Sequence, residues 1–338
     1  MTKLLHFFLT LTIFSFIFYG CTSKSNEAYL PGYSGQVGEL IVVCPKSLYE
    51  SSLQKPIANT LEAPQYGLPQ DEPLYKVIQV NPNSFNQVLN THRNIFKVTV
   101  DDTVSKAGLI FKKNHYARGQ MMVEVKALNS LEAIEIIEKN ASGIVSLFDR
   151  AELNRLIARN KKQGQKEEEK KLLDRFGYSP VLQKDCEVRV NEQDFAWVRL
   201  MRERPVGGYQ HQIDQNLIIC ETNYTNRTQF LDSILNSLRD SIFSKIPGPS
   251  EGSYITSDYE FVPPVFNEIE LAGVFCKEAR GLWKMENNFM GGPYICYTLV
   301  HPRRDKLVHL IGFVYAPQFD KREYLRELEA ILKSISFN

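Results

Sequence analysis

The sequence predicts an α+β fold with two domains, in which antiparallel sheets carry helices on one face. Two observations support this prediction. Segments rich in β-branched and aromatic residues occur in groups before each helix, which is typical of hairpins. The helical segments that follow begin with residues suited to cap a helix N-terminus. Because helices do not follow each strand, a parallel Rossmann-like sheet is the less favoured alternative.

The first half of the chain contains five strand-like segments before its first long helix. They are residues 39–44, 75–80, 94–100, 108–112 and 121–126, with a short helix expected over about 47–59. Asn129 and Glu132 have the spacing of a capping box, so a helix is expected to begin there. Its apolar residues recur every three or four positions as far as Phe148, which predicts one buried face.

A second helical stretch, about 149–176, contains no large apolar residue between Arg159 and Lys171. A helix without apolar residues in its middle is exposed to solvent there, which is expected of a segment between two domains. A basic recognition patch is the alternative, and the interleaved Glu167, Glu168 and Glu169 weigh against it. The expected organisation is a first α+β domain at 35–158, a helical linker at 159–176 and a second α+β domain at 177–338.

The second domain contains an internal repeat of a strand and a capped helix. Trp197 precedes Gly207 and Gly208, then a strand and the capping residues at 226–229. Trp283 likewise precedes Gly291 and Gly292, then strands and a helix start at 320–323. We therefore expect two related halves, at 177–245 and 254–338.

The N-terminal segment has the layout of a secretory signal, with Lys3 as its only full charge before an apolar run. Gly20 before Cys21 is typical of bacterial lipoproteins, in which the cysteine becomes the lipidated N-terminus. Residues 1–20 are then a signal peptide and 21–34 a tether, and one acylated cysteine holds the protein on a membrane without spanning it. A plain signal peptide and a retained anchor are the alternatives. Phe18 and Tyr19 depart from the usual residues before the cysteine, whereas polar residues interrupt the run expected of a membrane span.

Charge and composition exclude several classes of function. Removing residues 1–20 removes Lys3 and no acid, so 39 basic residues face 39 acidic ones. That balance argues against a nucleic-acid partner, which requires a basic excess. No Cys-x-x-Cys pair and no zinc-type Cys/His spacing occurs, so no metal site and no cofactor are expected.

Five cysteines remain if Cys21 is acylated, and an odd number leaves at least one free thiol within a monomer. Most lie in apolar strand-like runs, where a cysteine is typically a small buried residue. Cys276 and Cys296, which flank an expected hairpin, are the one pairing worth testing. The five are Cys44, Cys186, Cys220, Cys276 and Cys296.

The run from Gly281 to Tyr294, with 312–317 downstream and Cys21 upstream, carries a family resemblance. It resembles an uncharacterised lipoprotein family of the Gram-negative envelope, known as domain of unknown function 4837. The resemblance implies an envelope lipoprotein and supplies no catalytic residue, cofactor or partner.

The two Gly-Gly segments are the candidate partner surface, because large residues flank glycines that allow close approach. Aromatic, Met and Arg side chains concentrate in recognition surfaces. The alternative is a tight hairpin whose aromatic residues fold onto the sheet. The candidate residues are Trp283, Phe289, Met290, Gly291, Gly292, Pro293, Tyr294, Trp197, Arg204, Gly207 and Gly208.

No catalytic motif accompanies these residues: the sequence has no Gly-x-Ser-x-Gly elbow, no phosphate-binding loop and no His-Glu-x-x-His. We therefore expect a non-enzymatic binding or assembly module with an envelope protein or glycan as partner. An envelope hydrolase or transferase built from sequence-distant residues is the alternative. Glu27 is the only acid of the tether, which favours the periplasmic side of the outer membrane over surface exposure. The triplet at 102–104 also fits an O-glycosylation pattern, which recurs by chance at 232–234 and 240–242.

Overall fold

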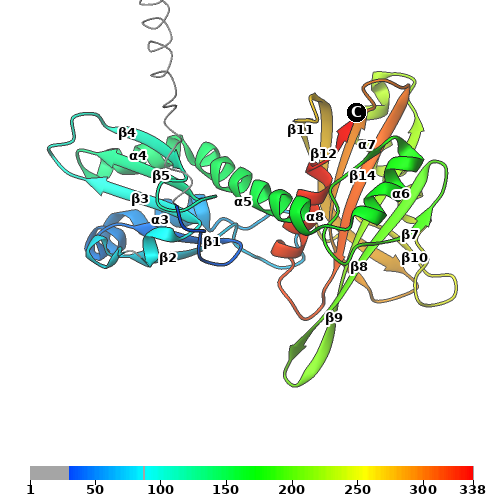
Figure 1. Ribbon diagram of the computed structural model, residues 1–338, viewed down its shortest axis with the longest axis horizontal. Helices are drawn as coiled ribbons and strands as arrows, with labels where there is room; N and C mark the ends of the chain where they lie inside the picture. Colours follow the sequence, from blue (N-terminus) through cyan, green and yellow to red (C-terminus); the bar gives the residue numbers. More distant parts are fainter. Residues whose placement is uncertain (1–29, 87, 338) are drawn as a thin grey trace, which may run out of the picture.

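A computed structural model describes residues 30–86 and 88–337 and divides them into two domains joined by a long helix (Figure 1). That helix, α5 (Ala141–Gln163), begins in the first domain and ends against the second. The predicted α+β class and two-domain layout are confirmed. The signal segment and Cys21 lie outside the described residues. No helix in the described residues is both long and apolar enough to cross a membrane.

The first domain contains five strands and a small set of helices. In chain order they are β1 (Glu39–Val43), α2 (Lys46–Leu48), the π-helical turn η2 (Tyr49–Leu53), α3 (Gln54–Leu61), β2 (Lys76–Val80), the 3₁₀ turns η3 (Pro82–Ser84) and η4 (Leu89–Thr91), β3 (Asn94–Val100), β4 (Gly108–Lys113), β5 (Met121–Ala127) and α4 (Ser130–Lys139). The five predicted strands all form, and the predicted short helix corresponds to α2 to α3.

The strands of the first sheet run in the order β2-β1-β3-β5-β4. β1 is parallel to both β2 and β3, β3 is parallel to β5, and only β4 pairs antiparallel. Here the strand directions differ from the antiparallel expectation. Parallel neighbours need a crossover of a dozen or more residues, and the segment between β1 and β2 supplies one that contains α2 and α3.

Helices cover one face of the first sheet, as predicted. Residues of α3, α4 and α5 pack against β1, β3 and β5 in one core. The other face carries a smaller cluster that includes Ile41 and Ile95, covered by Phe85, Leu89 and Tyr116 from loops and a 3₁₀ turn.

The first long helix begins where the sequence predicts, but its end differs. Asn129 accepts a hydrogen bond from the Glu132 backbone N–H (3.0 Å). The Glu132 carboxylate accepts from the Leu128 N–H (2.7 Å), one residue earlier than in a standard capping box. The helix ends at Lys139 because the Asn140 side chain donates to the Ile136 carbonyl (2.7 Å) and its backbone leaves helical geometry. α5 then starts at Ala141 and continues past the break predicted near 149.

The second domain is built on one large antiparallel sheet. Its elements are α6 (Lys166–Phe176), β6 (Tyr178–Ser179), β7 (Glu187–Asn191), β8 (Phe195–Val206), β9 (Tyr209–Asn223), the 3₁₀ turn η5 (Arg227–Phe230), α7 (Asp232–Phe243), β10 (Tyr254–Asp258), β11 (Val265–Leu271), β12 (Val274–Glu286), β13 (Gly291–Val300), β14 (Lys306–Tyr315), α8 (Arg322–Lys333) and β15 (Ser336–Phe337). The strand order is β10-β12-β13-β14-β9-β8-β7, with β11 paired to β12 and a small β15-β6 pair beside it.

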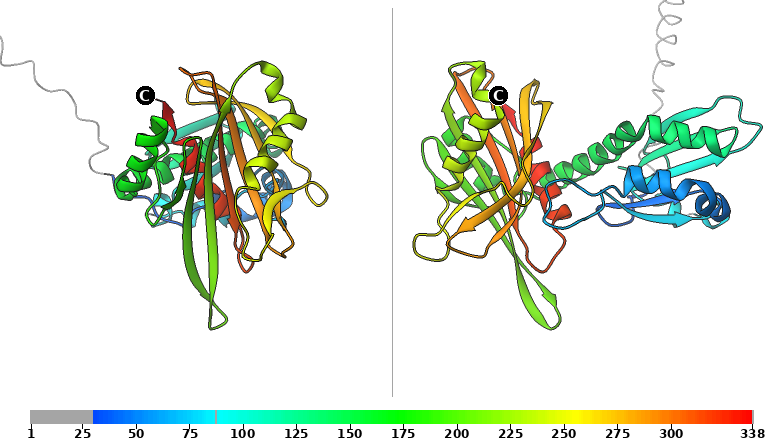
Figure 2. Two further views of the ribbon diagram at one scale, coloured as in Figure 1. Left: turned by 90° about the vertical axis from the view of Figure 1, so that its right-hand side faces the viewer. Right: turned by 180° about the vertical axis from the view of Figure 1, so that it is seen from behind.

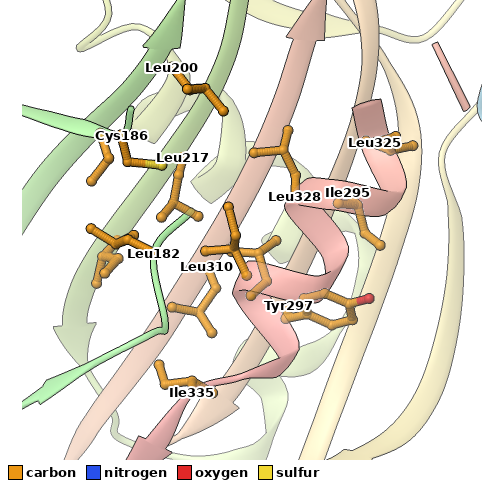
Figure 3. Close-up of a cluster of buried hydrophobic side chains, with 14 of the residues drawn as sticks. Leu182, Cys186, Leu200, Leu217, Ile295, Tyr297, Leu310, Leu325, Leu328 and Ile335 are labelled. Carbon is orange, nitrogen blue, oxygen red and sulfur yellow. The ribbon is translucent and has the colours of Figure 1, made fainter. Parts of the chain in front are cut away.

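Helices cover both faces of this sheet, which corrects the expectation of one covered face. α8 and α6 pack on one face and α7 on the other (Figure 2). Figure 3 shows Leu328 of α8 among Leu217, Ile295 and Leu310 of the first of these faces. The reason lies in β13 and β14, whose inner residues are buried on both sides of the strand, so both faces must be shielded from water.

The strand-then-helix order of the expected repeat occurs twice in the second domain, with two differences. α7 and α8 lie on opposite faces, and the second unit has five strands (β10 to β14) before its helix, whereas the first has four (β6 to β9). Gly207 and Gly208 form a turn, whereas Gly291 and Gly292 begin β13. The relation between 177–245 and 254–338 therefore stays a prediction.

The first domain caps a helix of the second. Both Glu72 carboxylate oxygens accept a backbone N–H at the start of α8, from Lys321 and Arg322 (2.7 Å each). Lys321 is the N-cap residue, and its side chain makes no capping hydrogen bond. The cap predicted at 320–323 is therefore supplied by Glu72 of the first domain. Arg326 of α8 also donates to the Leu74 carbonyl (3.1 Å). These contacts attach α8 to the first domain.

Candidate functional site

The β8–β9 hairpin extends beyond the rest of the second sheet. Pairing of β7 with β8 reaches Arg199, and pairing of β14 with β9 ends at Asp214. The hairpin continues past both points to a free tip, as Figures 1 and 2 show. We call residues 200–213 the arm.

The tip of the arm is the predicted Gly-Gly turn. Gly207 and Gly208 both have positive φ, +57° and +85°. Two consecutive positive φ values define a type I′ turn, whose twist matches that of the two strands it joins. Tyr209, directly after the turn, is 76% exposed, and Val206 before it is also exposed.

One side of the arm faces α8 through two arginines. Arg204 Nη1 donates to the Tyr324 hydroxyl (2.8 Å), and its guanidinium lies 5.2 Å from the ring centre of Phe319. Arg202 Nη2 donates to Glu327 Oε2 (2.6 Å). Both side chains start on β8 and reach partners on α8 and the loop before it. These contacts support the base of the arm.

Positive charge exceeds negative charge around this side of the arm. Glu327 pairs with Arg202 and also with Arg159 (3.5 Å). Arg204 forms no ion pair with any of the described residues. Two of these three guanidinium groups therefore share one carboxylate, and the third, that of Arg204, has no carboxylate in ion-pair contact among the described residues.

The arm also has an open strand edge. Alternate residues of an antiparallel strand direct their N–H and C=O groups away from the partner strand. Since Val206 and Tyr209 close the two-residue turn, Gln210 and Gln212 direct these groups outward. β14 does not cover them because it ends at Tyr315. On the opposite edge, Pro205 lacks an N–H, which blocks strand pairing there.

The predicted partner surface is divided between the core and two exposed tips. Trp283, Gly292, Pro293 and Tyr294 are buried, so they do not belong to a surface, and the alternative of aromatic residues folded onto the sheet holds for them. The Trp283 indole donates to the Val314 carbonyl (3.1 Å).

Three further candidates are half-buried: Met290 packs against the core, Trp197 donates to Asn216 (2.8 Å), and Gly291 begins β13. Phe289 is fully exposed on the β12–β13 turn, and Arg204, Gly207 and Gly208 lie on the arm. The structure thus brings Arg204 and the first glycine pair together and separates them from the second motif. Phe319, Tyr324 and Glu327 were not predicted, because they lie more than a hundred residues from the arm in sequence.

A buried histidine is the strongest catalytic candidate of the second domain. His309 lies between two hydroxyl groups, with Nδ1 3.1 Å from Thr298 Oγ1 and Nε2 3.1 Å from Thr222 Oγ1. Burial lowers the pKa of His309 to about 3, so the imidazole is neutral. Cys296 lies nearby, 3.9 Å from Thr298, and burial raises the pKa of its thiol to about 11. A neutral imidazole and a protonated thiol inside the core form a structural hydrogen-bonded group.

The five cysteines of the described residues are all free and buried. Burial was predicted for the four in apolar runs, and Cys186, which lies outside such a run, is buried as well. Burial raises the pKa of every one of these thiols. The Cys276–Cys296 pairing does not form, because the two side chains belong to the cores on opposite faces of the sheet. Among the described residues, no group of His, Cys, Asp and Glu side chains is arranged to hold a metal ion.

A cavity of about 200 Å³ lies between the domains. It is lined by Gln65, Tyr66, Leu74, Asp149, Leu153, Arg280, Arg326 and Glu329. Its arginines already have carboxylate partners: Arg280 pairs with Glu329 (3.0 Å) and Arg326 with Glu323 (3.0 Å). Both pairs lie within the second domain, and Arg326 also reaches Asp149 of α5 (3.7 Å) and the Leu74 carbonyl before β2 (3.1 Å). The charged residues of this cavity therefore hold the domains together, which is a structural role.

Comparison with known families agrees with the division into two domains. Residues 165–334, half of the chain, match the model of a domain of unknown function, DUF4837. The chain belongs to the DUF4837 family. A second domain of unknown function, DUF8532, matches residues 34–161. The DUF4837 match begins just after α5 and contains the whole large sheet with its arm. No curated protein matches the sequence.

Proposed function

We propose that the protein is a lipid-anchored component of the bacterial cell envelope that binds another envelope molecule through the arm. The observation that carries this proposal is the arm itself, a projecting hairpin with an exposed Tyr209, an open edge and an Arg204 that has no carboxylate partner among the described residues. Aromatic and arginine side chains are those enriched at the centres of binding surfaces. The partner is an envelope protein or glycan, and the binding is non-enzymatic.

The place where the chain enters the first domain supports the anchoring part of the proposal. Arg118 N–H donates to the Pro31 carbonyl (2.8 Å), and Arg93 N–H donates to that of Ser34 (3.0 Å). The Tyr33 ring lies under two guanidinium groups, 5.0 Å from Arg93 and 5.4 Å from Arg155. Leu30 is nine positions after Cys21, a stretch that spans at most about 30 Å when extended. A lipid on Cys21 would therefore keep the first domain close to the membrane.

The helix α5 then sets the distance to the second domain. Its 23 residues correspond to a length of about 35 Å. Glu72 and the Leu74 carbonyl attach α8 to the first domain. Near the far end of α5, Arg159 pairs with Glu327 of α8 (3.5 Å), so the connection is braced at two places. In this arrangement the first domain is a base and the second domain presents the arm to a partner.

Anchoring is tested with Cys21→Ala. We expect this variant to leave the membrane fraction, because the neutral body supplies no polybasic patch for a second attachment. Cell fractionation and immunoblotting measure the distribution, with Ser23→Ala as the control from the same segment. Recovery of Cys21→Ala with the membranes would refute a lipid anchor at this cysteine.

Binding is tested by placing a photo-crosslinking amino acid at Tyr209 in living cells. We expect one discrete adduct at this position and none at Phe261, which is similarly exposed but lies on another loop of the second domain. The adduct should disappear when Arg204→Glu is added, and mass spectrometry of the adduct identifies the partner. Equal adducts at both positions would exclude the arm as the binding surface, and an adduct that persists in Arg204→Glu would exclude Arg204 from the contact.

A further inference from the structure

We infer that the ligand of the arm is an extended acidic polypeptide segment that adds as a strand to the open edge of β9. This inference rests on the proposed function and specifies its partner. Strand addition uses backbone hydrogen bonds for affinity and alternate side chains for specificity. Both requirements are met by features of the arm.

The backbone requirement is met by the outward groups of Gln210 and Gln212. These groups lie on the edge of β9 that pairs with β14, beyond the last β14 pair, Tyr315 with Asp214. β14 leaves this line after Tyr315, where a turn begins with a hydrogen bond from Phe319 N–H to the Ala316 carbonyl (3.1 Å). An added strand would therefore take up the position that β14 vacates.

The side-chain requirement is met by the two arginines on the α8 side. Arg202 and Arg204 are two residues apart on β8, so they share a face at a spacing of roughly 7 Å. Their guanidinium groups reach across β9 toward α8, as the contacts with Glu327 and Tyr324 show. They thus lie above the strand whose edge is open. Acidic residues at alternate positions of an added strand match this spacing.

Charge distinguishes an acidic segment from a basic or neutral one. Glu327 is the one carboxylate that pairs with Arg159 and Arg202, and Arg204 has no acidic partner among the described residues. A carboxylate of the ligand would give Arg204 an acidic partner and accept a charge-assisted hydrogen bond from its guanidinium group. Anionic lipid would satisfy the charge as well, but it would leave the backbone groups of the β9 edge unused.

The experiment measures binding of the purified full chain to a fluorescent peptide of five Glu-Val repeats by anisotropy. We expect saturable binding that weakens with salt and that falls about tenfold or more in Arg204→Glu. Arg227→Glu is the matched control, because Arg227 is also exposed and unpaired within the described residues but lies near α7. A Lys-Val peptide and a fully N-methylated Glu-Val peptide should not bind, since one lacks the charge and the other the backbone donors.

Three results would overturn the inference. They are equal binding by Arg204→Glu and wild type, equal binding of the N-methylated peptide, and binding of phosphatidylglycerol vesicles instead of the peptide. The outcome also separates this inference from the proposed function. If the Tyr209 crosslink forms in cells while the acidic peptide does not bind, the arm remains a binding surface and its ligand belongs to another class.

Discussion

Trp283→Ala is expected to lower the free energy of unfolding of the second domain by about 3–5 kcal/mol, the usual cost of emptying a large aromatic site in a core. Trp283 is 2% exposed and packs edge-on against Phe313, with ring centres 5.5 Å apart. Removing the indole also leaves the Val314 carbonyl without its donor. Urea denaturation followed by far-ultraviolet circular dichroism measures the loss, since the change removes one of the two tryptophans.

Phe289→Ala is the matched control, because Phe289 is fully exposed on the turn that follows the same strand. Its unfolding free energy should stay within about 0.5 kcal/mol of wild type. If Trp283→Ala were as stable as Phe289→Ala, the core position of the indole would be wrong. Because Trp283 is buried, a loss of binding in Trp283→Ala would result from unfolding of the second domain and not from loss of a contact with the partner.

Local sequence patterns were sufficient to predict the strands of the first domain and the start of α4. The strand β3 has the bounds predicted from its β-branched and aromatic residues, and Asn129 caps α4 as its spacing with Glu132 indicated. These features depend on neighbours a few residues away. The direction of pairing does not, since β1 lies between β2 and β3 through contacts that no local pattern encodes.

The covered faces of the second sheet follow from the apolar content of its central strands. The run 307–314 is apolar almost throughout, and it becomes β14, whose inner residues are buried on both faces. A continuous apolar run predicts a strand with both faces covered, whereas alternation predicts one covered face. The cap of α8 could not be predicted from neighbouring residues, because it is Glu72, about 250 residues earlier in the chain.

The candidate site was predictable in part, for a similar reason. The Gly207-Gly208 pair indicated a tight turn, and the turn forms at the tip of the arm. Gly291-Gly292 is the same dipeptide, but a Cβ at Gly292 would lie 2.1 Å from the Val314 carbonyl oxygen. That glycine is required by close packing beneath Trp283, not by a turn. The same dipeptide therefore marks an exposed tip in one place and a core contact in the other.

Acid is expected to destabilise the second domain through His309. Its folded pKa is about 3 and its ordinary value is 6.5, so between these pH values the unfolded state binds a proton that the folded state does not. Stability from this group is thus complete above pH 6.5 and is lost as the pH falls toward 3. Between pH 6.5 and 4.5 the loss is about 2 kcal/mol, because the slope reaches about 1.4 kcal/mol per pH unit only where the unfolded histidine is mostly protonated. Urea midpoints measured at a series of pH values report it.

His309→Gln isolates this contribution from those of other titrating groups. The variant should lose about 1.4 kcal/mol per pH unit of the pH dependence below 6.5, whatever its stability at neutral pH. Thr222→Val is the control, because it removes one hydroxyl contact and keeps the imidazole buried, so it should be less stable but retain the slope. An unchanged slope in His309→Gln would mean that this histidine is protonated in the folded protein. In that case Thr222 and Thr298 would accept hydrogen bonds from an imidazolium, and the group would no longer be a neutral part of the core.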